Sequence, residues 1–174
     1  MRGGLNSIQM VLLWVIQERQ GGWGGLIRDS CGKWIKGYMR YIGISTSIIT
    51  EFWALRDGLM LASQLGITHL AMELDAKVVV NLILSRKTPN NSYTSLFNDC
   101  RYLLWQFQQT VTRHVFREAN RGADCLAKGA CSLTFDFVIF DVPPTPNLNV
   151  IVDADANGLY SLRLIANTSP FVAS

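Results

Sequence analysis

The chain has 174 residues and a formal net charge of +3, and 49% of its residues are hydrophobic against 17% that are charged. This length and composition allow one full hydrophobic core, so a single domain with an extension is the simplest organisation. The mildly basic charge excludes the dense positive field of a protein that binds nucleic acids by electrostatics alone.

The cysteines and the first apolar run indicate a soluble, intracellular protein in the nucleus or cytoplasm. No two cysteines have CxxC spacing, so we expect reduced thiols rather than disulfides. The apolar run from Val11 to Ile16 is too short for the core of a signal peptide or for a membrane span. We therefore expect no contact with a membrane.

In chain order, the first clear pattern is a β-hairpin followed by a long helix. Residues 21–42 alternate turn glycines with short apolar stretches, and the break at Asp29–Gly32 is typical of a hairpin turn. Apolar residues then recur at helical spacing over 47–65, with Gly66 where a C-terminal cap belongs.

The remaining elements alternate between strands and helices. We predict strands at 67–74, 110–116 and 135–141 and helices at 76–84, 93–107 and 120–131. The proline cluster from Pro143 to Pro146 breaks structure before a weakly patterned tail. This order favours an α/β layered fold with one sheet.

Three acidic residues lie at the end or inner face of a predicted element, namely Glu51, Asp75 and Asp124. Each has a structural interpretation when taken alone. The helix dipole favours Glu51 in a first turn, and Asp75 can cap the following helix. Asp124 can share a solvated helical face with Asn120, and a lone strand histidine such as His114 is more often structural than catalytic.

The three acidic segments nevertheless occur together in a recognisable order: TEFWALRDGL, MELDAKVVV and RHVFREANRGADCLAKGA. They closely resemble the plant ribonuclease H-like domains related to retrotransposon reverse transcriptases. The segment GGWGGLIRDSCGKWIKGYMRYIG is similar to the second and third strands of that family. The resemblance covers residues 21–131 and implies a ribonuclease H-like α/β fold, with one mixed five-stranded sheet flanked by helices.

The resemblance also implies a chemistry, in which four carboxylates hold two Mg²⁺ ions at the scissile phosphate of the RNA strand in an RNA/DNA hybrid. Carried over to this chain, Glu51, Asp75 and Asp124 would be metal ligands and catalytic residues. His114 resembles the histidine that assists proton transfer or product departure, and Asn120 is its helical neighbour. The resemblance thus implies an endonuclease by family, and we expect a monomer. Glu73 and Asp57 are given no role.

The fourth carboxylate is missing from the first strand. The family carries a segment like NTDGAS followed by GNPG there, whereas this chain has LNSIQMVLLWVIQERQ, with no acidic residue before Glu18. One permitted choice of codons for residues 5–18, translated from the third base of the first codon, gives KLNTDGASLGNPG. The codon for its Asp spans the boundary between the Gln9 and Met10 codons. We interpret residues 1–20 as a frameshifted first strand, although freely chosen third bases leave coincidence as the alternative.

This interpretation divides the chain into an aberrant segment at 1–20, a ribonuclease H-like domain at 21–132 and a C-terminal extension at 133–174. Residues 8–16 are apolar and β-branched enough to form a central strand, so we expect the sheet to survive. Hydrolysis should be weak or absent, because Gln9, Met10 and Val11 cannot replace a carboxylate ligand.

Other functions remain open from the sequence. A non-catalytic module could hold a hybrid through its scattered basic residues, such as Lys33, Lys36, Arg40, Arg113, Arg117 and Arg121. A domesticated retroelement remnant that acts through protein partners, or a gene-model artefact, are further alternatives.

Overall fold

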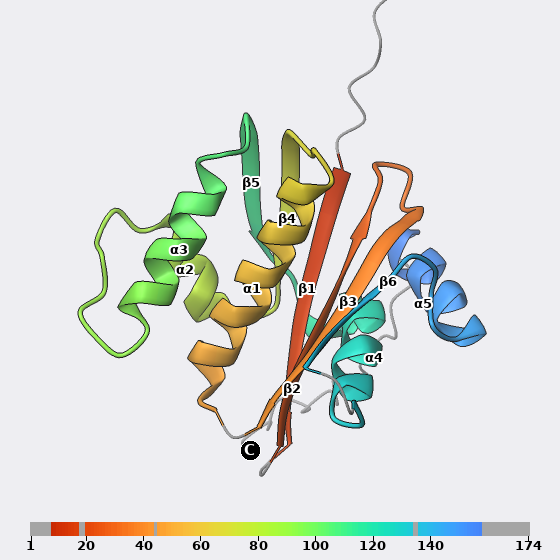
Figure 1. The fold of residues 1–174 in the computed structure, drawn as a ribbon. Coiled ribbons are helices and arrows are strands. Elements are labelled where there is room, and N and C mark those ends of the chain that lie inside the picture. The colour runs from red at the N-terminus through yellow and green to blue at the C-terminus, as the bar shows by residue number, and fades with distance from the viewer. Residues whose placement is uncertain (1–7, 18–19, 44, 134–135, 158–174) are drawn as a thin grey trace, which may run out of the picture.

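The computed structural model describes residues 8–17, 20–43, 45–133 and 136–157 (Figure 1). Its strands are β1 (Ile8–Gln17), β2 (Gln20–Arg28), β3 (Trp34–Gly43), β4 (His69–Leu74), β5 (Gln109–His114) and β6 (Phe137–Phe140). Its α-helices are α1 (Ser47–Gln64), α2 (Lys77–Leu84), α3 (Thr94–Leu104), α4 (Arg121–Ala130) and α5 (Pro146–Ala156). A short 3₁₀ turn at Arg117–Ala119 precedes α4.

The strands form one mixed sheet in the order β5-β4-β1-β2-β3-β6. β1 is parallel to β4 on one side, with Met10 opposite Met72, and antiparallel to β2 on the other, with Trp14 opposite Trp23. Without β1, the sheet would separate into the pair β4-β5 and the trio β2-β3-β6. The α/β class is as expected, but the expected count of five strands is wrong, because β6 pairs antiparallel with β3.

Alternate residues of β2 face opposite sides of the sheet, and each side has its own core. Trp23 and Ile27 belong to the larger cluster, which is built with α1, α2 and α3. Leu26 belongs to the smaller cluster, which is built with α4 and α5. α4 lies so close to β2 that a Cβ atom at Gly24 would come within 2.6 Å of the Ala127 nitrogen. Glycine is therefore required at that position.

The helices follow most of the expected boundaries. α1 ends beside Gly66, whose φ of +70° is the left-handed conformation that glycine adopts at little cost. α3 ends at Leu104, three residues earlier than predicted. The unexpected helix is α5, which Pro146 begins rather than prevents, because a proline lacks only an amide that is unpaired in the first turn. Within the described residues, no helix is long and apolar enough to cross a bilayer.

Part of the C-terminal extension packs on the rest of the domain. Leu148 and Val152 of α5 are buried against α4. The buried Asp155 carboxylate accepts hydrogen bonds from the Gly122 amide at 2.9 Å and from Arg121 Nε at 3.0 Å. Residues 136–157 thus share the core with α4, while residues 134–135 and 158–174 of the predicted extension lie outside the described part.

Asp57 forms a buried polar cluster on the α1 side of the sheet. Its Oδ2 atom accepts hydrogen bonds from Trp23 Nε1 at 3.0 Å and from Arg40 Nε at 2.7 Å, and its Oδ1 atom accepts one from Arg40 Nη2 at 3.2 Å. The Arg40 guanidinium also lies over the Phe137 ring at 4.4 Å. Asp57 therefore ties α1 to β2 and β3, which is a structural role.

We expect Asp57→Asn to lower the free energy of unfolding by about 3 kcal/mol, because it removes the buried counter-charge of Arg40 and leaves that guanidinium with the exposed Asp136 carboxylate at 3.5 Å. Urea denaturation of the purified chain measures this loss. The matched control is Asp99→Asn, whose ion pair with Arg56 is half-exposed and should contribute less than about 1 kcal/mol. Equal losses in the two variants would contradict the structural role of Asp57.

The four cysteines are free thiols that differ in exposure. Cys100 is buried, and its Sγ donates a hydrogen bond to the Phe52 carbonyl oxygen at 3.5 Å. Burial raises the pKa of the Cys100 thiol well above its ordinary value, and the nearby Asp99 carboxylate raises it further. By contrast, Cys31 is exposed at the turn between β2 and β3.

At pH 8 we expect iodoacetamide to modify Cys31 in the native protein and to leave Cys100 unmodified. The raised pKa keeps the Cys100 thiol protonated, and only the thiolate reacts. Peptide mass spectrometry before and after addition of urea measures the two sites, and unfolding should make Cys100 reactive. Similar rates for both thiols in the native protein would show that Cys100 is not buried as described.

Candidate active site

The elements that carry the predicted site residues meet where β4 and β5 end. β1, β4 and β5 are mutually parallel neighbours in the sheet (Figure 1). Leu74 at the end of β4 pairs with His114 at the end of β5 and with Leu12 in the middle of β1, so the two carboxyl ends lie beside the middle of β1. We call this place the carboxyl edge. β3 runs in the same direction as β1, since both are antiparallel to β2. α1 follows β3 and carries Glu51, Asp75 follows β4, and α4 follows β5 and carries Asp124.

Glu51 and Asp75 differ from their simplest structural interpretations. Glu51 is the fifth residue of α1, one position beyond the first turn, and only 6% of its surface is exposed. The helix dipole therefore does not account for its position. Asp75 is not the N-cap of α2, because Ala76 occupies that position and α2 has no side-chain capping bond.

His114 is placed directly beside Asp75. The register of the parallel pair sets His114 opposite Leu74, and the Val115 amide donates to the Leu74 carbonyl at 2.9 Å. His114 Nε2 lies 3.1 Å from the Asp75 carbonyl oxygen, and its ring meets the Phe116 ring edge-to-face at 5.5 Å. The ring is thus oriented while the side chain stays exposed.

Asp124 lies in the first turn of α4, which begins after the buried N-cap residue Asn120. Its side chain is 16% exposed and forms an ion pair with Lys128 one turn further along the helix. The exposed Lys128 is compatible with a polar helical face, although the Asp124 side chain itself is mostly buried.

Glu73, to which the sequence analysis gives no catalytic or metal-binding role, forms a largely buried ion pair across the first strand. Its Oε2 atom lies 3.2 Å from Arg28 Nη2, and the two side chains are 15% and 8% exposed. Val11 of β1 pairs with both Glu73 and Leu26, so the ion pair links the strands on either side of β1. Sequence reasoning missed it, because Arg28 and Glu73 are 45 positions apart and no local pattern relates them.

The first strand supplies no carboxylate to this edge. Gln9 to Val11 pair with Ala71 to Glu73, and residues 8–17 include no Asp or Glu in any register. Among the residues that the structure describes, no group of three or more His, Cys, Asp or Glu side chains is placed to hold a metal ion. Of the four carboxylates that the sequence resemblance implies, the chain thus offers three, namely Glu51, Asp75 and Asp124.

Comparison with known proteins identifies relatives of this domain. A family model described as reverse transcriptase-like matches residues 13–130. A protein of Arabidopsis thaliana, named as a ribonuclease H protein, is 32% identical over 121 residues. That match covers 70% of this chain but 20% of the relative, so the chain spans about a fifth of the relative's length.

Solved structures show the same fold. The N-terminal ribonuclease H domain of Rv2228c from Mycobacterium tuberculosis matches with a TM-score of 0.65 at 25% identity, covering 72% of this chain and 94% of that one. Ribonuclease H1 of Halobacterium salinarum matches with a TM-score of 0.66 at 22% identity, and the match covers 71% of this chain and 96% of that one. LC11 ribonuclease H1, solved in complex with an RNA/DNA hybrid, matches with a TM-score of 0.65 at 20% identity. This match covers 72% of this chain and 96% of that one.

The family model spans well over half of the chain, from within β1 to the end of α4. The chain thus belongs to the reverse transcriptase-like family and contains its ribonuclease H-like domain.

Proposed function

We propose that this domain binds RNA/DNA hybrids and that the chain as it stands hydrolyses them weakly or not at all. The family supports the binding of hybrids, together with a structural neighbour that is solved with such a hybrid. The weak hydrolysis is inferred from one observation. The central strand β1, which lies between β4 and β2, has no acidic residue along its whole length.

Electrostatics explains why this loss matters. Glu51, Asp75 and Asp124 come from three elements that meet at the carboxyl edge, and like charges there repel one another and an incoming phosphate. Bound cations would offset that repulsion, but they need enough oxygen ligands to displace their water. With one carboxylate fewer, we infer that ion occupancy is low and that the edge stays anionic.

Within this proposal, Glu51, Asp75 and Asp124 are the remaining carboxylates of an incomplete site. His114 is the group that would exchange a proton with the substrate, since the Asp75 carbonyl orients it and its ring is exposed. Glu73 is not a candidate, because Arg28 already holds its carboxylate.

We expect the chain to cleave a labelled RNA/DNA hybrid in Mg²⁺ no faster than its Asp75→Asn variant. We also expect a second protein, in which KLNTDGASLGNPG replaces residues 5–18, to cleave clearly faster, because a first-strand carboxylate is restored. Gel analysis of the RNA strand measures both. Asp75→Asn in the restored protein should abolish the gain. Cleavage by the unaltered chain well above its own Asp75→Asn control would contradict the proposal.

A non-catalytic binding module is the second candidate, and the acid-free β1 favours it as well. Binding through Lys, Arg and backbone amides does not need a cation. We therefore expect the chain to retain most of its affinity for the hybrid in EDTA and to lose affinity steeply with added salt. Fluorescence anisotropy measures both effects. Loss of binding in EDTA would instead show that ions at the carboxyl edge hold the hybrid.

A further inference from the structure

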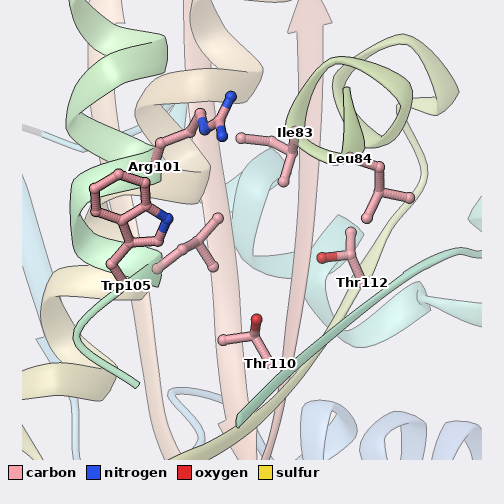
Figure 2. A pocket seen from close by; sticks show the side chains of 7 residues that line it. Ile83, Leu84, Arg101, Trp105, Thr110 and Thr112 are labelled. Carbon is pink, nitrogen blue, oxygen red and sulfur yellow. The ribbon is translucent and has the colours of Figure 1, made fainter. Parts of the chain in front are cut away.

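A shallow groove runs between α2, α3 and β5 (Figure 2). It consists of two hollows, of about 190 and 320 Å³, that share Arg101 and Trp105. The first is also lined by Ile83, Leu84, Thr110 and Thr112, and the second by Arg86, Asn98 and Tyr102. We call the two together the Trp105 groove.

The Trp105 groove is separate from the carboxyl edge. Trp105 follows α3 directly and precedes β5, so it lies near the amino end of that strand. His114 is at the opposite, carboxyl end of the same strand. A ligand in the groove would therefore make contacts that the residues of the carboxyl edge do not provide.

Two large aromatic side chains in the groove are exposed to an unusual degree. Trp105 is 78% exposed and Tyr102 is 66% exposed, whereas Trp23, Phe52 and Phe97 are fully buried. Flat aromatic rings at the surface are the platforms on which unpaired bases stack. Such stacking does not depend on the base, so it suits a single strand of mixed sequence.

The charges that line the groove favour an anionic partner. Arg86 is exposed, and no Asp or Glu lines either hollow. Arg101 is held in place, since its Nη1 donates to the Ser85 carbonyl at 3.3 Å and its guanidinium lies 5.6 Å from the Phe97 ring centre. The nearby Asp99 carboxylate is paired with Arg56 at 3.3 Å. The groove is thus basic as well as aromatic.

We propose that the Trp105 groove binds single-stranded nucleic acid, with bases stacked on Trp105 and Tyr102 and phosphates beside Arg86 and Arg101. The first hollow, of about 190 Å³, is smaller than the roughly 300 Å³ or more of sites that enclose a small molecule, and the second, of about 320 Å³, is lined by the mostly exposed Tyr102 and Trp105. A strand that lies along the surface fits this shape better than an enclosed ligand does.

The test measures the affinity of the full chain for a fluorescent oligo(dT) by anisotropy. Trp105→Ala should weaken binding by about 5- to 100-fold, the usual effect of removing one stacking platform, and Trp105→Phe should retain most of the affinity. Arg86→Gln should weaken binding and make it less dependent on salt. The matched control is Lys77→Gln, which removes the same charge from an exposed position in α2 that lines neither hollow and should change little.

Urea denaturation should give the same midpoint for Trp105→Ala as for the unaltered chain, because the ring is mostly exposed. Unchanged oligo(dT) affinity in Trp105→Ala would overturn the proposal. Equal losses in Arg86→Gln and Lys77→Gln would also overturn it, since net charge alone would then explain binding. If the chain bound an acidic peptide but not oligo(dT), the groove would be a protein-docking surface instead. Hybrid binding is assayed separately, so either proposal can fail without the other.

Discussion

Backbone pairing along β1 holds the two halves of the sheet together. On one side it is parallel to β4, and on the other antiparallel to β2. The carboxyl edge exists because of the parallel pairing, and the helices on both faces cover a continuous sheet only because β1 is present. A strand with neighbours on both sides requires apolar and β-branched residues, and IQMVLLWVIQ provides them. The fold therefore accommodates a first strand that carries no acidic residue.

The elements that could be predicted are those whose signals are local. The helix expected at 47–65 is found at Ser47–Gln64, because helical periodicity and a C-terminal glycine agree there. The hairpin of β2 and β3 likewise has its turn where the sequence predicts it. α5 was missed because a proline cluster indicates a break. Its apolar residues, Leu148 and Val152, become meaningful only once α4 is available to pack against.

The sequence places the candidate site residues on particular helices and strands, but it does not report their surroundings. Chain order alone places Glu51, Asp75, His114 and Asp124 at the end of predicted elements, and parallel strands bring such ends together. The ion pairs of Arg28 with Glu73 and of Arg40 with Asp57 depend on strand register and on helix docking. No pattern in the sequence reports either. These pairs decide which carboxylates are structural and which remain at the edge.

The hydrogen bonds of Asp155 connect α4, where the family match ends, to α5, which lies beyond that match. Likeness to the family stops at residue 130, with α4. The positive end of that helix is nevertheless neutralised by a carboxylate 33 positions after Gly122, in a helix that the family match does not include. The folding unit of this protein thus extends beyond the stretch that the family model matches. Truncation at the end of that stretch would therefore leave the Gly122 amide without its carboxylate acceptor and would uncover the α4 residues that pack on Leu148 and Val152.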